Sequence, residues 1–207
     1  MVKMIKIAIV LAVIGHILCG ISDCLLSYSK KGRLNLKDIK DPVKMSAMFA
    51  DMPLSFPLAS MIMGTFAITL FGFGYFGLGY WMKAYSAAAS NIMFISTVIF
   101  LVSIVVHHVI CGVVEWGYIR LGRTDEARTA MLELQMKTIC TMVTGYAGWL
   151  AFLITLFIMV ASGRTGLPVW GCIFNTAIIT LVMAPTQIPA KGNVAGALMY
   201  LGLLFFI

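Results

Sequence analysis

The chain has 207 residues, of which 61% are hydrophobic and only 11% are charged. Its mean hydropathy is +0.98, whereas soluble domains carry about 25% charged residues. This composition excludes an ordinary soluble enzyme and predicts a single membrane domain over residues 1–207, in contact with the lipid bilayer. The net charge of +7 does not indicate a nucleic-acid partner, because the basic residues gather in connections between apolar segments, as in cytoplasmic loops beside anionic lipid.

Six apolar segments are long enough, or nearly so, to cross a bilayer, which requires about 20 residues. They cover approximately residues 4–27, 54–82, 88–119, 132–161, 168–186 and 192–207. The sequence therefore predicts an all-α, polytopic bundle of six transmembrane helices. The first segment follows Lys3 and Lys6 as a signal peptide would, but His16 interrupts it and no small-residue cleavage site follows. We therefore expect a retained helix.

Two connections carry helix-start signals. The longest, residues 28–53, is basic and amphipathic. Its second half predicts a short helix that lies on the membrane surface and begins at Asp41-Pro42. In residues 120–131, Thr124 is the expected N-cap, with Asp125 and Glu126 in the favourable first turn. The fourth helix is therefore predicted to begin in water, before its membrane span.

Basic residues predict the orientation. With six spans, the first, third and fifth connections share one side of the membrane and contain Lys30, Lys31, Arg33, Lys37, Lys40, Lys44, Arg120, Arg123, Arg128 and Lys191. The other side contains Lys3, Lys6, Lys83 and Arg164. The positive-inside rule then predicts a multipass protein with the first group in the cytoplasm and both termini outside.

The three histidines of the chain, His16, His107 and His108, all lie inside apolar segments. Asp23 and Glu115 follow seven residues after His16 and His108, respectively. Ionisable groups are costly in hydrocarbon, so these five residues are the candidate catalytic site. A seven-residue separation places each His–acid pair on one helix face, about 10 Å apart along the axis. We expect a histidine layer near the bilayer centre, with a carboxylate layer below it, between the first and third helices.

Three chemical interpretations of these residues remain open. A divalent metal such as Zn would need three or four ligands from His16, His107, His108, Cys19 or Cys111, although no HExxH-type spacing supports it. A proton or cation path would use the two layers as relay stations. A structural role would pair the carboxylates with basic residues at the membrane interface and bond the histidines across helices.

The functional expectation follows the same alternatives. The first is a pocket for binding or chemistry on a hydrophobic or lipid-like small molecule, with the histidines supplying metal ligation or acid–base chemistry. The second is a small proton- or cation-coupled transporter or channel, working as a homo-oligomer. The third is a noncatalytic membrane partner subunit.

Small and amide residues predict how the helices pack. Gly72 and Gly74 begin a GxGxxG pattern, which in dinucleotide-binding proteins follows a β-strand. Here the pattern falls inside a membrane span with no preceding strand, so these glycines indicate close helix packing. Asn175 and Asn193 are expected to hydrogen-bond between helices. Between them, Pro185 indicates a turn or a broken helix.

The segment GISDCLLSYSKKGRL, followed by ADMPLSFP, resembles the start of a small bacterial family of multipass membrane proteins of unknown function. The resemblance covers the first helix, the first connection and the start of the second helix. It implies a bacterial inner-membrane protein, and it implies no activity and no site residues.

Overall fold

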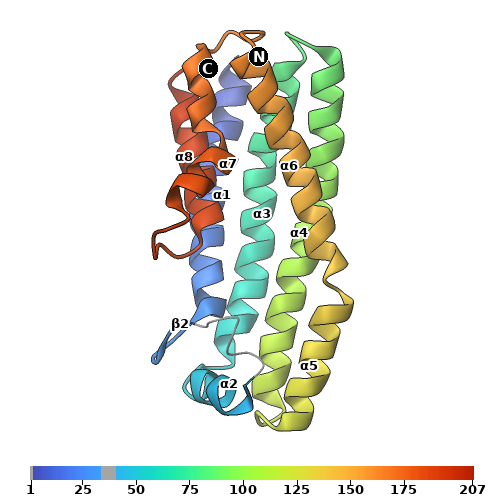
Figure 1. The fold of residues 1–207 in the computed structure, drawn as a ribbon, viewed down its shortest axis with the longest axis vertical. Coiled ribbons are helices and arrows are strands. Elements are labelled where there is room, and N and C mark those ends of the chain that lie inside the picture. The colour runs from blue at the N-terminus through green and yellow to red at the C-terminus, as the bar shows by residue number, and fades with distance from the viewer. Residues whose placement is uncertain (1, 34–40) are drawn as a thin grey trace.

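The computed structural model describes residues 2–33 and 41–207, and in these residues it is an all-α bundle with one small β-hairpin (Figure 1). The elements in chain order are α1 (Val2–Ser27), β1 (Tyr28–Ser29), β2 (Gly32–Arg33), α2 (Pro42–Phe49), α3 (Ser55–Met82), α4 (Ala87–Arg120), α5 (Asp125–Lys137), α6 (Cys140–Ala161), the 3-10 helix η2 (Val169–Phe174), α7 (Thr176–Met183) and α8 (Lys191–Leu204). Strands β1 and β2 pair antiparallel. The predicted all-α class is confirmed.

Four helical stretches of the described chain are long and apolar enough to cross a membrane: α1, α3, α4 and the α5–α6 stretch over Asp125–Ala161. The prediction of six spans is therefore wrong for the last two segments. Helices α7 and α8 contain 8 and 14 residues, which makes them about 12 and 21 Å long against a hydrocarbon core of about 30 Å. The segment 168–186 is divided at Asn175, whose side chain caps α7 by accepting a hydrogen bond from the Ala177 N–H.

The helices form a ring that is closed at one end of the molecule. Helix α1 packs against α3, α3 against α4, and α4 against α6. The ring is completed by η2, which packs on α6 and α8, and by α8, which packs on α1. Close approach of α3 to its neighbours depends on glycine, because a Cβ on Gly72 or Gly74 would lie 2.8 Å from Leu101 or Tyr200 side-chain atoms. The predicted packing role of these glycines is confirmed.

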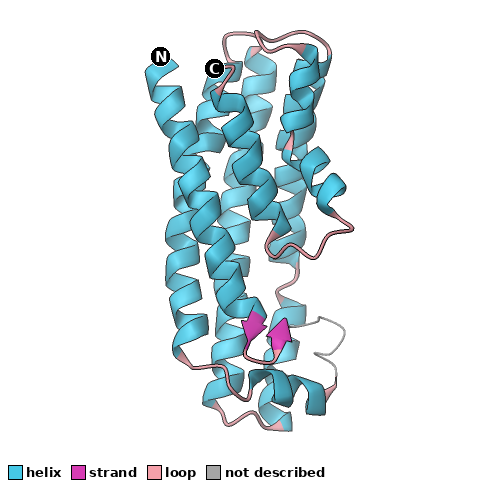
Figure 2. Cartoon of the chain, turned by 90° about the vertical axis from the view of Figure 1, so that its left-hand side faces the viewer, coloured by secondary structure: helices cyan, strands magenta, loops and turns pink. Residues whose placement is uncertain are grey.

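Helices α7 and α8 form a hairpin that turns back well before the opposite end of the bundle (Figures 1 and 2). The tip of this hairpin, residues 184–190, lies beside the last turns of α1. A Cβ built on Gly20 would lie 3.6 Å from the Asn193 Cβ and 3.7 Å from the Ala190 Cβ. Lys191, predicted to belong to a cytoplasmic connection, instead lies at this tip and donates a hydrogen bond to the Ala184 carbonyl at 2.7 Å.

Helix α4 is longer than a bilayer requires. Its 34 residues give about 51 Å of helix, and α5 runs beside its far end (Figure 1). Thr124 caps α5 by accepting a hydrogen bond from the Ala127 N–H, which confirms the predicted helix start. A turn at residues 138–139 separates α5 from α6.

Helix α2 also caps this end of the bundle. Asp41 accepts hydrogen bonds from the Val43 and Lys44 N–H groups, and Pro42 opens the helix, as predicted. The apolar side of α2 packs on α4, where Phe49 contacts Tyr118 edge-to-face, and the expected position of this helix on the membrane surface stays a prediction. Lys37 and Lys40 lie outside the described residues.

The start of α1 and the C-terminus lie at the same end of the bundle (Figure 1). We name this the termini end. The opposite end, with β1–β2, α2 and α5, is named the basic end, because Lys30, Lys31, Arg120 and Arg128 lie there. Which end faces the cytoplasm stays a prediction.

Candidate functional site

The described part of the chain contains a histidine–carboxylate pair between two membrane helices. His108 of α4 and Asp23 of α1 face each other, with 3.6 Å between Nδ1 and Oδ1. The His108 side chain is 9% exposed and the Asp23 side chain is 35% exposed. The histidine is therefore held inside the bundle, while the carboxyl group reaches an open edge.

The other ring nitrogen of His108 faces two buried serines. Its Nε2 lies 3.0 Å from Ser22 Oγ, 3.3 Å from Ser60 Oγ and 3.1 Å from the Ser60 carbonyl oxygen. The serines also bond reciprocally across α1 and α3. Ser22 Oγ donates to the Ser60 carbonyl and Ser60 Oγ donates to the Ser22 carbonyl, both at 2.9 Å. These bonds fix the relative height of the two helices.

The hydrogen-bond pattern assigns protons to His108. A carbonyl oxygen only accepts, and both serine hydroxyls already donate to carbonyls, so this arrangement is satisfied when Nε2 carries a hydrogen. If Nδ1 carried none while Asp23 were ionised, its lone pair would face a carboxylate at 3.6 Å. A proton on either Nδ1 or the Asp23 carboxyl removes this repulsion. At 3.6 Å the two groups lie within ion-pair distance and beyond hydrogen-bond distance.

Asn193 of α8 connects this pair to a second histidine. Its Nδ2 donates to Asp23 Oδ2 at 2.7 Å, which leaves its Oδ1 facing His16 Nδ1 at 3.1 Å. Because the amide oxygen accepts, His16 Nδ1 is the donor. The resulting network runs from His16 through Asn193 and Asp23 to His108, and it joins α1, α4 and the α7–α8 hairpin.

His16 is enclosed by aromatic rings. It is 4% exposed, stacks on Phe71 with ring centroids 4.4 Å apart, and lies 5.7 Å from the Tyr200 ring by the same measure. Both His16 Nε2 and the Tyr200 hydroxyl are buried without a hydrogen-bond partner among the described residues. The inner end of the network therefore has unused hydrogen-bonding capacity.

Glycines make the room that the two histidine rings occupy. A Cβ on Gly64 of α3 would overlap the His108 ring, and a Cβ on Gly196 of α8 would overlap the His16 ring. Overlap of this kind cannot be relieved by a small side-chain movement, since both rings are buried and hydrogen-bonded. Each histidine is thus seated in a gap that only a glycine backbone provides.

Of the five predicted site residues, His16, Asp23 and His108 come together in one network, and two lie outside it. His107 points to a different neighbour, as the turn of about 100° per residue requires. Its Nε2 lies 3.5 Å from Cys111 Sγ and its Nδ1 3.4 Å from Thr141 Oγ1. Glu115 has one buried carboxyl oxygen without a hydrogen-bond partner in the described residues.

The predicted layers are rearranged by the relative height of the helices. Ser22 faces Ser60 on α3, and Gly64 of α3 faces His108, so His108 lies level with Asp23 rather than with His16. The pairs therefore form across helices rather than along each helix. In the part of the chain that the structure describes, no group of three or more His, Cys, Asp or Glu side chains is placed to hold a metal ion.

Three network residues were not among the predicted site residues. Asn193 was expected only to bond between helices, and it does so at the centre of the network. Ser22 stands next to Asp23 in the sequence, which was a usable signal. Nothing in the sequence around Ser60 indicates that it meets His108.

The comparisons with known proteins give a family and no activity. A family model described as a family of unknown function (DUF6796) matches residues 1–205. No curated protein and no solved structure matches the chain.

Proposed function

The chain belongs to this family of unknown function, and we propose that it is a small proton-coupled membrane transporter or channel. The single observation that carries the proposal is the His108–Asp23 pair, in which two ionisable side chains face each other 3.6 Å apart between α4 and α1. An intramembrane ionisable pair of this kind is typical of proton relays.

Asp23 is the more exposed member of the pair, at 35% against 9% for His108, and in this proposal protons reach the pair through its carboxyl group. Asp23 lies one turn from the end of α1 at Ser27, on the side of the basic end. This position favours exchange with water at that end.

A second proton-transfer step would lead from the His108–Asp23 pair toward the termini end. Asn193 bonds both Asp23 and His16, and beyond His16 the Tyr200 hydroxyl also lacks a partner. An amide does not readily relay a proton, so we propose that Asn193 acts as a latch. When the hairpin moves, Asn193 leaves Asp23, and the path between Asp23 and His16 opens.

An alternative chemistry at the same residues is less well supported. Ser22, His108 and Asp23 lie in the order of a nucleophile, a base and an orienting carboxylate. However, His108 Nε2 carries a hydrogen toward the Ser60 carbonyl, so it has no lone pair with which to deprotonate Ser22. Both serines are 0% exposed, which leaves no approach for a substrate carbonyl.

Binding of a hydrophobic or lipid-like small molecule remains the second candidate function. The partial exposure of Asp23 favours it, together with the unpaired oxygen of Glu115. In that role the two carboxyls would bind polar atoms of the ligand. Mass spectrometry of small molecules that copurify with the wild-type chain, and that are lost in Asp23→Asn, would support this candidate over proton coupling.

Proton flux into vesicles tests the first candidate. The full chain is reconstituted into vesicles that contain pyranine, potassium and valinomycin, and the external medium is acidified. Wild-type vesicles should acidify faster than protein-free vesicles. Asp23→Asn and His108→Gln should fall to the protein-free rate, because either change removes an ionisable member of the pair.

His107→Gln is the matched control, because it removes the adjacent histidine without touching the network. It should acidify at the wild-type rate. Proton coupling is overturned if wild-type vesicles acidify no faster than protein-free ones, or if Asp23→Asn retains the wild-type rate.

A further inference from the structure

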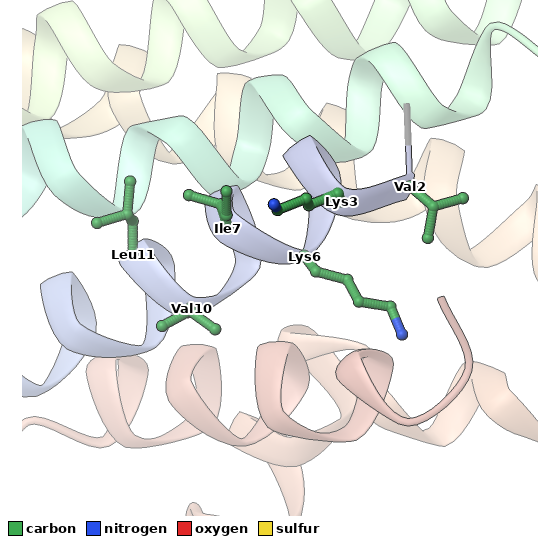
Figure 3. A pocket seen from close by; sticks show the side chains of 6 residues that line it. All are labelled: Val2, Lys3, Lys6, Ile7, Val10 and Leu11. Carbon is green, nitrogen blue, oxygen red and sulfur yellow. The ribbon is translucent and has the colours of Figure 1, made fainter.

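A groove of about 540 Å³ lies on the outer side of α1, at the termini end. All of its lining residues come from the first three turns of the helix: Val2, Lys3, Lys6, Ile7, Val10 and Leu11. Figure 3 shows Lys3 and Lys6 beside Val2, with Ile7, Val10 and Leu11 continuing along the helix. The groove thus has a cationic mouth and an apolar floor.

Among the described residues, no ion pair joins Lys3 or Lys6 to an acidic group. All eight acidic residues of the chain fall within residues 23–51 and 115–133. The ion pairs of the described residues all involve these acids, as His108–Asp23, Arg128–Asp125 and Lys137–Glu133. Lys3 and Lys6 therefore have no carboxylate partner in the described part of the chain, and a ligand for the mouth must carry negative charge.

The apolar floor continues as a stripe down α1. Ile7, Val10, Ile14, Ile17 and Ile21 are all 44–53% exposed, and their spacing of three and four residues places them on one helix face with Lys3. From Lys3 to Ile21 this face is about 27 Å long, close to the hydrocarbon thickness of about 30 Å. A hydrocarbon chain can lie along this stripe while a charged group remains at the lysines.

We propose that this groove binds a phospholipid with an anionic headgroup. The phosphate lies between the ammonium groups of Lys3 and Lys6, and one acyl chain follows Ile7, Val10 and the stripe below. Basic pockets at membrane-helix ends are suited to such headgroups. The proposal is independent of the proton-coupled function, because it uses no residue of the His16–His108 network.

A second copy of the chain is the competing occupant of this face. The stripe has the seven-residue repeat of a helix-pairing seam. In a two-fold pair the same surface meets itself, so Lys3 and Lys6 of one copy would face the same lysines of the other. Four uncompensated ammonium groups in contact disfavour that packing, whereas the phosphate of one lipid offsets one of the two positive charges of its own copy.

Native mass spectrometry of the full chain tests the proposal. The protein in a nonionic detergent is titrated with phosphatidylglycerol and, separately, with phosphatidylethanolamine of the same acyl chains. Wild type should bind the anionic lipid more tightly. The double variant Lys3→Gln/Lys6→Gln should lose about thirtyfold in affinity for it, since each lysine near an anionic lipid contributes about fivefold.

Two further variants separate the parts of the site. Lys30→Gln/Lys31→Gln removes the same charge at the basic end, and it should bind phosphatidylglycerol like wild type. Ile7→Trp fills the apolar floor without changing charge, and it should weaken binding of the anionic lipid. Glycerol 3-phosphate, which has the phosphate without acyl chains, should not compete.

Three outcomes overturn the proposal. One is equal affinity for the two lipids, and another is unchanged phosphatidylglycerol binding in the Lys3→Gln/Lys6→Gln variant. The third is a wild-type dimer that Ile7→Trp converts to a monomer, because the face would then be a contact between copies. None of these results bears on proton flux, so the two proposals fail separately.

Discussion

Asp23 is the residue on which the polar network converges. Its two carboxyl oxygens face different helices, Oδ1 toward His108 of α4 and Oδ2 toward Asn193 of α8. His108 in turn uses its second nitrogen on the Ser22–Ser60 contact between α1 and α3. The His108–Asp23 pair is therefore bonded to side chains or backbone of four helices, α1, α3, α4 and α8.

The two nitrogens of His108 can be tested separately. His108→Gln can keep a donor toward the Ser60 carbonyl, because the glutamine amide reaches the position of Nε2, but it removes the partner of Asp23. We expect pH-difference infrared spectra of the wild-type protein to contain a protonation band of the pair. The band should be absent in His108→Gln and in Asp23→Asn.

His107→Gln should leave this infrared band in place. A spectrum of Asp23→Asn that is identical to the wild-type spectrum would mean that the carboxyl group does not contribute to the band.

Gly196 offers a test of the close contact between α8 and the His16 ring. A Cβ at this position would lie 2.7 Å from His16 Nδ1 and closer still to other ring atoms, so Gly196→Ala forces the ring out of place. Overpacking of this kind costs about 1–3 kcal/mol. We expect a lower midpoint in thermal unfolding followed by tryptophan fluorescence in detergent.

Gly192→Ala is the control on the same helix, since a Cβ there meets no atom within 4 Å. It should be neutral or slightly stabilising, by up to about 1 kcal/mol, because alanine favours the helix over glycine. Equal destabilisation by the two variants would contradict the assigned contact.

Among the elements, the α7–α8 hairpin is the one whose position depends on the site. Asn175 anchors its first half by donating a hydrogen bond to the Leu153 carbonyl of α6 at 2.8 Å. Asn193 anchors the second half to Asp23 and His16. At the tip, Ala190 adopts a left-handed conformation with φ of +47°, which costs a non-glycine residue about 1–2 kcal/mol. The tip is therefore held by its contacts rather than by its own backbone preference.

Asn193→Ala should release the tip. It removes both side-chain bonds and leaves the α6 anchor intact. We expect faster hydrogen–deuterium exchange in residues 184–196, with α4 and α6 unchanged. Gln187→Ala, at an exposed tip position, should exchange like wild type. Unchanged exchange in Asn193→Ala would show that the asparagine does not hold the hairpin.

The whole molecule is longer than a bilayer is thick, and its two ends differ in whether basic residues are accompanied by acidic ones. The acids of the chain lie within residues 23–51 and 115–133, while Lys3, Lys6, Lys83 and Arg164 lie elsewhere. Four candidate spans and one returning hairpin leave the start of α1 and the C-terminus at one end (Figure 1). Six full crossings would have had the same result, because both numbers are even.

Orientation in the membrane is a testable property of this arrangement. In a background without the native cysteines, we expect Lys30→Cys and Arg128→Cys to react with an impermeant maleimide only from the cytoplasm. Lys83→Cys and Ser162→Cys should react only from outside, as the positive-inside rule predicts. The reverse pattern would invert the orientation, and labelling of all four from one side would contradict the four-span arrangement.

Local features of the sequence determined much of this protein. Its apolar composition predicted a helical membrane protein, and the caps at Asp41 and Thr124 predicted where α2 and α5 begin. These properties depend on neighbouring residues, which is why they could be read directly. The position of ionisable groups in apolar segments also singled out five residues, of which His16, Asp23 and His108 share one network and His107 and Glu115 do not.

Only the tertiary structure decided which of these groups meet. The pairing of His108 with Asp23 depends on the relative height of α1, α3 and α4, which the Ser22–Ser60 contact and Gly64 set. The number of candidate spans depends on where the last two apolar segments turn back, and hydropathy measures apolarity rather than the length of an unbroken helix. Such features arise from contacts between residues far apart in the chain, as between Asn193 and Asp23, and no local pattern encodes them.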